Sequence, residues 1–136
     1  MLLIDTSVVV AATNRADTHH QRCAELLRGA AGPLLMPVLT IAEAADLLER
    51  RLGRAAELGL ARAVESGELV PEPVRETDWA RIAALVEKYA DLPLGIVDAS
   101  IVAAAERLRV RSIATLDQRR FRTVRPGHVD ALTLLP

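Results

Sequence analysis

Short apolar runs alternate with helix-length segments along the whole chain, and this alternation limits the possible folds more than any other feature. The runs at 2–4, 34–38 and 112–115 contain no regular polar alternation, which is typical of strands buried on both faces of a sheet. Helical patterns separate the runs. A strand–helix–strand order predicts a parallel sheet, because parallel neighbours need a long crossover, usually a helix, to connect them.

The remaining elements follow from periodicity and from glycine and proline breaks. We expect further strands at 69–70, broken off by Pro71 and Pro73, and at 133–135. Helices are expected at 8–12, 19–28, 40–52, 54–66, 79–90 and 98–109. Thr40, with Glu43 three residues later, has the spacing of a capping box. The expected architecture is a three-layer α/β/α domain over residues 1–136, with a central, mostly parallel sheet of four to five strands.

Composition narrows the possible functions. Hydrophobic residues make up 51% of the chain and aromatic residues only 2%, so the core is aliphatic and an aromatic platform for stacked bases is not expected. The net charge of −1 leaves any contact with a polyanion to a local patch. The single cysteine, Cys23, excludes an internal disulfide, and we find neither a signal peptide nor a membrane-spanning run. A cytoplasmic protein is expected.

Asp98 follows a Pro-Leu-Gly turn and stands at the start of an alanine-rich helix. The helix dipole favours its ionised form, and a fixed carboxylate suits a hard cation. Three other acids are expected near it at the carboxyl edge of the sheet: Asp5 and Asp117 just past strands, and Glu43 after the second strand. As alternatives, Asp5 and Asp98 are helix caps, Asp117 is a turn residue and Glu43 is a solvated or capping residue.

Crowded carboxylates repel one another, and a divalent cation relieves the repulsion. Since the four acids offer oxygen ligands without a His–Cys cluster, they point to Mg2+, with Mn2+ as a substitute, rather than zinc. Such an ion activates water and neutralises charge on a phosphate.

Several pieces of the chain match a known family in order and spacing, and together they cover essentially the whole sequence. They are Leu3-Ile-Asp5-Thr-Ser7, Glu43, Leu94-Gly-Ile-Val-Asp98-Ala-Ser-Ile and Ile113-Ala-Thr115-Leu-Asp117 with Phe121. The chain resembles the PIN-domain ribonucleases, and more closely the VapC-type toxins of bacterial type II toxin–antitoxin modules. The fold implied is therefore PIN-like.

The resemblance also implies roles. Asp5, Glu43, Asp98 and Asp117 would form the metal site, with Asp5 and Asp98 touching the cation directly. Hydroxyl neighbours would be Thr6, Ser7 and Thr115. The implied activity is metal-dependent endoribonuclease cleavage of cellular RNA, inhibited by a VapB-type antitoxin. A homodimer and a larger toxin–antitoxin complex are expected.

Two surfaces are candidates for contacts. Residues 106–125 hold seven arginines against two acidic residues, and we expect Arg119, Arg120 and Arg122 to contact RNA phosphates. The alternatives are a solvated surface or ion pairs with nearby acids. The leucine-rich hairpin at 40–66 suggests an apolar groove near the site, filled by an antitoxin helix or a second copy of the chain; ordinary packing on the sheet is the alternative.

Other functions fit less well. A phosphorelay receiver needs a central acceptor aspartate and a late lysine, whereas residues 45–75 offer only Asp46 and no lysine follows Lys88. A haloacid-dehalogenase-type phosphatase needs Asp-x-Asp where this chain has Asp5-Thr-Ser7. The main alternative is a catalytically silent module that binds RNA or a protein partner.

Overall fold

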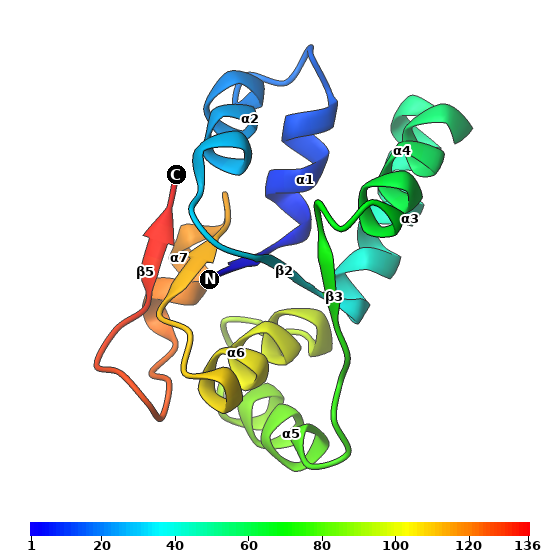
Figure 1. Ribbon diagram of the computed structural model, residues 1–136. Coiled ribbons are helices and arrows are strands. Elements are labelled where there is room, and N and C mark those ends of the chain that lie inside the picture. The colour runs from blue at the N-terminus through cyan, green and yellow to red at the C-terminus, as the bar shows by residue number, and fades with distance from the viewer.

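A computed structural model describes all residues from Met1 to Pro136, with a five-stranded sheet at its centre (Figure 1). The sheet has the order β3-β2-β1-β4-β5 and every neighbouring pair is parallel, which confirms the expected fold class. In the central register, Leu3 pairs with Leu35 on one side and Ile113 on the other. The strands are β1 (Leu2–Ile4), β2 (Leu34–Pro37), β3 (Val70–Glu72), β4 (Ser112–Ala114) and β5 (Thr133–Leu135).

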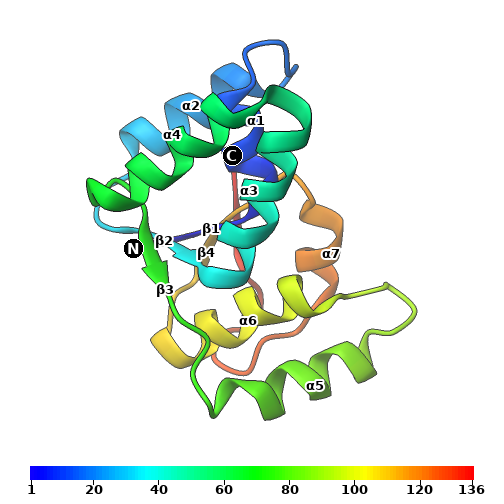
Figure 2. The same cartoon turned by 90° about the vertical axis from the view of Figure 1, so that its right-hand side faces the viewer.

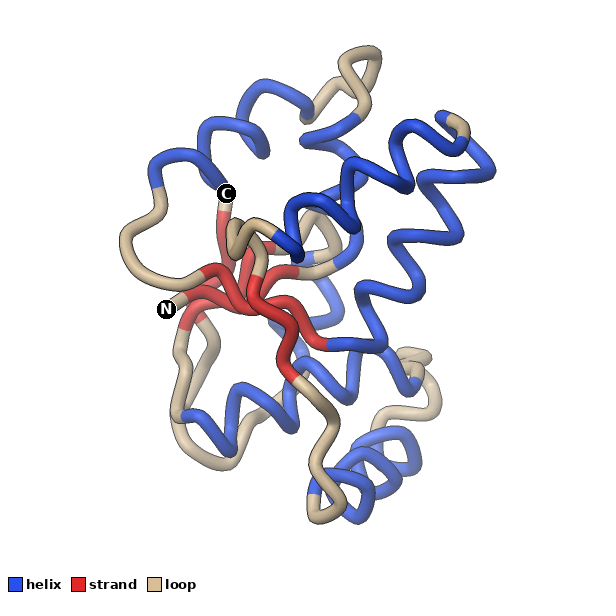
Figure 3. The backbone as a smooth tube through the Cα atoms, turned by 45° about the vertical axis from the view of Figure 1, so that its right-hand side comes forward, coloured by secondary structure: helices blue, strands red, loops and turns tan.

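Helices cover both faces of the sheet (Figures 2 and 3). The group α1–α4 lies on one face, whereas α5 and α6 pack together on the other. The short helix α7 turns Phe121 into the core shared with α5 and α6. The helices are α1 (Thr6–Thr13), α2 (His20–Gly29), α3 (Val38–Leu52), α4 (Arg54–Glu65), α5 (Asp78–Lys88), α6 (Ile96–Leu108) and α7 (Gln118–Thr123).

The two cores follow from the period-two geometry of the strands. Leu3, Leu35 and Ile113 point into the core beneath α5 and α6. Their neighbours point the opposite way, into the core beneath α1–α4; these are Leu2, Ile4, Met36 and Ala114. Because both faces are apolar, the strands contain the unbroken apolar runs seen in the sequence.

The start of α3 differs from the expectation. This helix begins at Val38, so Thr40 is not its N-cap, and no side-chain cap hydrogen bond is present. Thr40 is fully buried and donates from Oγ1 to the Pro37 carbonyl over 2.6 Å. The predicted capping box between Thr40 and Glu43 is therefore wrong.

The start of α6 also differs. It begins at Ile96 after Gly95, so Asp98 lies within the first turn rather than at the cap position. The carboxylate still lies in the first turn, and stabilisation of its charge by the helix dipole stays a prediction.

Three further differences are local. Pro71 lies inside β3, which tolerates it because β3 is an edge strand. The helix expected at 79–90 spans Asp78–Lys88; Trp79 at its start is 48% exposed, whereas Ile82 and Leu85 are buried. Helix α7 was not predicted.

No helix of the structure has both the length and the apolar character that a membrane crossing demands.

Candidate active site

The four carboxylates predicted from the sequence all line one pocket of about 280 Å³. Asp5 and Asp117 follow the adjacent strands β1 and β4, Glu43 lies in α3 after β2, and Asp98 lies in the first turn of α6. Parallel strands bring these positions to the same edge of the sheet. The lining residues are Asp5, Thr6, Ser7, Val10, Asp17, Glu43, Leu47, Arg51, Asp98, Leu116, Asp117 and Arg120.

Asp5 is the most enclosed of the four, with only 5% of its surface exposed. It is the N-cap of α1, and its Oδ1 accepts a hydrogen bond from the Thr6 N–H over 2.7 Å. Its Oδ2 accepts from Thr115 Oγ1 over 2.7 Å. Burial, with smaller contributions from the charges of Asp98 and Glu43, raises the pKa of Asp5 to about 6 despite these hydrogen bonds.

Thr115 and Ser7 connect Asp5 to the turn that carries Asp117. The Asp117 N–H donates to Thr115 Oγ1 over 3.0 Å. The Leu116 N–H donates to Ser7 Oγ over 3.0 Å, and Ser7 Oγ is 3.4 Å from Asp5 Oδ2. Thr115 is fully buried behind the pocket rather than part of its lining. These hydroxyls therefore fix the turn after β4 relative to the start of α1.

Arg120 enters the same pocket as a cation. Its Nη1 lies 2.8 Å from Asp98 Oδ2, and its Nε lies 3.0 Å from Asp117 Oδ2. The hydrogen bond to Asp98 raises the pKa of the Arg120 guanidinium, with a further contribution from the charge of Asp117. Sequence analysis predicted Arg120 as a phosphate contact and weighed ion pairing as the alternative; the structure shows the ion pairs.

The other arginines of 106–125 do not form one cationic patch. Arg119 and Arg122 are exposed and lie outside the pocket lining. Arg107 pairs with Glu72 over 2.9 Å and with Asp78 over 3.0 Å, and it does not line the pocket. Burial alone would raise the pKa of Asp78, but hydrogen bonds from Arg107 and Arg75 hold it below its ordinary value. Arg107 therefore ties α6 to the end of β3 and to the start of α5.

Sequence analysis missed two charged residues of the pocket, Asp17 and Arg51. Arg51 is exposed near the end of α3 and forms no ion pair in the structure. It follows Glu43 by eight residues, with Leu47 midway, so helical spacing could have placed it on the same face. Asp17 lies between α1 and α2, where no periodicity applies. Its Oδ1 accepts from the His19 N–H over 2.7 Å.

The donor set of the pocket fits a hard divalent cation. Its acidic oxygens come from Asp17 as well as from Asp5, Glu43, Asp98 and Asp117, and neither histidine nor cysteine lines it. Asp5 is buried with a raised pKa, so a nearby positive charge would stabilise its ionised form. No three acidic, histidine or cysteine side chains are already drawn together as a ligand cluster, and Arg120 bridges two of the acids.

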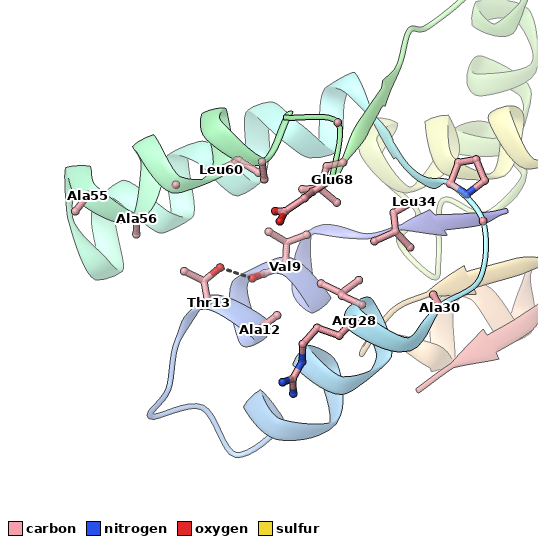
Figure 4. A pocket seen from close by; sticks show the side chains of 17 residues that line it. Val9, Ala12, Thr13, Arg28, Ala30, Leu34, Ala55, Ala56, Leu60 and Glu68 are labelled. Carbon is pink, nitrogen blue, oxygen red and sulfur yellow. Dashed lines mark hydrogen bonds between the residues drawn. The ribbon is translucent and has the colours of Figure 1, made fainter. Parts of the chain in front are cut away.

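A second hollow, of about 690 Å³, lies along a different face of α1 (Figure 4). Ten of its 17 lining residues are hydrophobic, among them Val9 of α1 and Leu60 of α4. Arg28 and Glu68 are its charged residues. The groove predicted for the 40–66 hairpin thus involves α4. The other leucines of the hairpin lie elsewhere. Leu47 lines the acidic pocket, Leu48 is in the core, and Leu52 and Leu58 are exposed. We refer to this hollow as the apolar groove.

Fold and site together define a small α/β domain with a carboxylate pocket at the carboxyl edge of a parallel sheet. The family described as "PIN domain" matches residues 2–125. Ribonuclease VapC26 of Mycobacterium tuberculosis is 33% identical over 135 residues, which is 99% of this chain and 100% of that protein. The chain therefore belongs to the PIN-domain family, among its VapC-type members.

Solved structures share the fold. VapC20 of Mycobacterium tuberculosis, a sarcin–ricin loop cleaving toxin, superposes with a TM-score of 0.81 at 19% identity, covering 97% of this chain and 99% of that one. A toxin–antitoxin complex from Klebsiella pneumoniae has a TM-score of 0.71 at 18% identity, covering 91% of this chain and 92% of that one.

Proposed function

We propose that this protein is a Mg2+- or Mn2+-dependent endoribonuclease that acts as the toxin of a toxin–antitoxin pair. The observation that carries the proposal is the meeting of Asp5, Glu43, Asp98 and Asp117 at one pocket. The relative named Ribonuclease VapC26 supports an RNA substrate, and the toxin–antitoxin complexes among the similar structures support an antitoxin partner.

In this proposal Asp5 and Asp98 hold the cation directly, with Glu43 and Asp117 completing its surroundings. The bound cation supplies activation of water and neutralisation of charge at the phosphate. With the cation bound, Asp5 or Asp98 would take the proton from the attacking water, whose oxygen bonds to phosphorus as the P–O bond to the leaving ribose oxygen breaks. That ribose oxygen would take up a proton from solvent.

Thr115, Thr6 and Ser7 act as positioning residues. Thr115 Oγ1 donates to Asp5 Oδ2 and accepts from the Asp117 N–H, so one hydroxyl orients two of the acids. Arg119 and Arg122 are exposed and available for RNA phosphates beside the pocket.

The decisive test is cleavage of cellular RNA by the purified protein with Mg2+ or Mn2+, with EDTA as the metal-free control. Wild type is expected to cleave, and Asp98→Asn is not. Asp46→Asn is a matched control, because Asp46 lies on α3 outside the pocket and pairs only with Arg50. Equal cleavage by wild type and Asp98→Asn would refute the assignment. RNA binding without cleavage by wild type would favour the catalytically silent module.

The apolar groove is the proposed docking site of the antitoxin. Its lining of small side chains on α4, including Ala56, Gly59 and Ala63, leaves room for another helix to approach closely. Arg28 and Glu68 offer one charge of each sign for orientation. An amphipathic helical segment of the antitoxin is therefore the occupant we propose. A homodimer and a larger toxin–antitoxin assembly stay predictions.

A further inference from the structure

Both ion pairs within the acidic pocket belong to one side chain, Arg120. Its guanidinium uses Nη1 for Asp98 and Nε for Asp117, and each contact is made to the Oδ2 atom. The same two carboxylates are among the proposed cation ligands. A guanidinium and a divalent cation cannot share these oxygens without strong repulsion, because like charges a few ångströms apart in a partly buried pocket are weakly screened.

We propose that Arg120 is a built-in counter-cation of the acidic pocket, which a divalent cation must displace from Asp98 and Asp117 before the guanidinium can turn to RNA. The inference rests on the proposed function, since it takes these acids to be cation ligands. It assigns Arg120 two successive partners, the carboxylates and then a phosphate, and so couples cation binding to RNA binding.

The anchoring of Arg120 allows this exchange. The next residue, Phe121, is fully buried in the core beneath α5 and α6, so the backbone of α7 is fixed. The Arg120 side chain, by contrast, is 39% exposed. A long arginine on a fixed backbone can leave the carboxylates for solvent, or for a phosphate at the pocket mouth, without any change in the fold.

The pocket also has a reason to keep such a counter-charge. Asp5, Asp98 and Glu43 repel one another, as the raised pKa of Asp5 reflects alongside its burial. Arg120 offsets part of this repulsion through Asp98 and Asp117. Exchange of one positive charge for two would then offset more of the repulsion and release the guanidinium at the moment when the site becomes competent.

Arg119 provides a matched control. It precedes Arg120 on α7 and carries the same charge, but it is exposed, forms no ion pair and does not line the pocket. Substitution of either arginine by alanine changes the net charge equally, so any difference between the two variants reports the contacts with Asp98 and Asp117.

The first experiment measures Mn2+ binding, by calorimetry or electron paramagnetic resonance, for wild type, Arg120→Ala, Arg119→Ala and Asp98→Asn. Removal of the competing cation is expected to tighten Mn2+ binding by about 5- to 10-fold in Arg120→Ala and by less than about 2-fold in Arg119→Ala. Arg120→Gln, which keeps most of the aliphatic stem, is measured in parallel in case the alanine variant loses its fold. It is expected to tighten binding as well.

Unchanged or weaker Mn2+ binding in the Arg120 variants overturns the inference alone, provided that Asp98→Asn removes binding in the wild-type background. Absence of any Mn2+ binding that depends on Asp98 overturns the proposed metal site and the inference together. The two failures are therefore distinguishable.

The second experiment measures RNA binding with and without Mn2+, by stopped-flow mixing on a timescale shorter than cleavage. The gain in RNA affinity on adding Mn2+ is expected to be at least about 3-fold smaller in Arg120→Ala than in Arg119→Ala, because only Arg120 is released by the cation. Equal gains in the two variants would show that Arg120 is a static ion-pair partner and would overturn the coupling.

Discussion

The acidic pocket and the apolar groove are formed on different faces of the same helix, α1, yet they differ in almost every physical property. Ser7 and Val10 of α1 face the pocket, whereas Val9 and Ala12 face the groove. The pocket is the smaller hollow and collects acids from five separate segments. The groove is larger and is lined mainly by hydrophobic side chains. One helix thus separates a surface suited to chemistry from one suited to recognition.

The contrast also concerns energy. The pocket lowers the stability of the folded chain, because its carboxylates repel one another and burial of Asp5 disfavours the ionised form of this side chain. In the groove, exposed apolar surface gains free energy only when a partner covers it. Substitutions in the two hollows should therefore have separable effects, and the following predictions test that separation.

The largest effect is expected for cleavage. Asp5→Asn should lower RNA cleavage by about 10³-fold, because it removes a charge that the transition state requires. Gly59→Arg, in the groove, should leave the rate of the free toxin within about 2-fold of wild type, since it touches none of the acids. Single-turnover cleavage of a defined RNA measures both. A comparable loss in the two variants would mean that the hollows are not independent.

The next effect is on stability and its pH dependence. The pKa of Asp5 is about 6 in the folded chain against an ordinary value of 3.8, so the folded state holds the proton more tightly. The associated stability is present below the lower value and is lost as the pH rises to about 6. Above that pH the buried charge costs about 3 kcal/mol.

Asp5→Asn should therefore raise the free energy of unfolding near neutral pH, with a gain that shrinks toward about pH 4. Urea unfolding across this range in the presence of EDTA measures the difference. The exposed Asp46→Asn variant is expected to show no such trend. A pH-independent difference for Asp5→Asn would mean that burial of Asp5 does not destabilise its charge.

A smaller effect is expected for binding of the antitoxin. Gly59 lines the groove, and no atom lies within 4 Å of a Cβ added there, so an arginine can project into the groove without disturbing the fold. Gly59→Arg should weaken antitoxin binding by about 10- to 100-fold through loss of close packing. Co-expression rescue and a pull-down with the cognate antitoxin measure it. Full neutralisation of the Gly59→Arg toxin would exclude the groove as the docking site.

The smallest effect is expected for Gly59→Ala, which is also the control for the arginine variant. Alanine in a helix interior is more favourable than glycine by about 0.5 to 1 kcal/mol, and the space around this position is open. Thermal unfolding should show this gain, with antitoxin binding nearly unchanged. A destabilised Gly59→Ala variant would indicate that α4 needs glycine for packing.

The central strands β1, β2 and β4 were predictable because they are largely buried, so their sequences are mainly apolar runs. The edge strands β3 and β5 are more exposed, although the last strand, Thr133–Leu135, was also placed correctly. Edges of helices were less predictable: Val38 begins α3 although Thr40 has the better capping side chain, because Thr40 is buried and bonded to Pro37. Helix α7 has only six residues and one buried side chain, Phe121, which is too short for periodicity to appear.

Convergence of the four acids was predictable from topology, since strand ends meet at one edge. Their charge partners were not. Arg120 carries the same sequence signal as Arg119, and only the orientation of α7 decides which of them reaches Asp98. Asp17 lies in a loop, where position depends on tertiary contacts and not on local pattern. The sequence therefore indicates which acidic side chains lie close together, whereas the structure is needed to show which basic side chains pair with them.

The hydrogen bond from Thr115 to Asp5 joins residues 110 positions apart. A ribosome must therefore synthesise most of the chain before the second wall of the nuclease pocket exists. Fragments released early, or still emerging from the exit tunnel, would carry Asp5 without the strand that orients it. A chain organised in this way acquires its complete acidic pocket only when its synthesis is nearly finished.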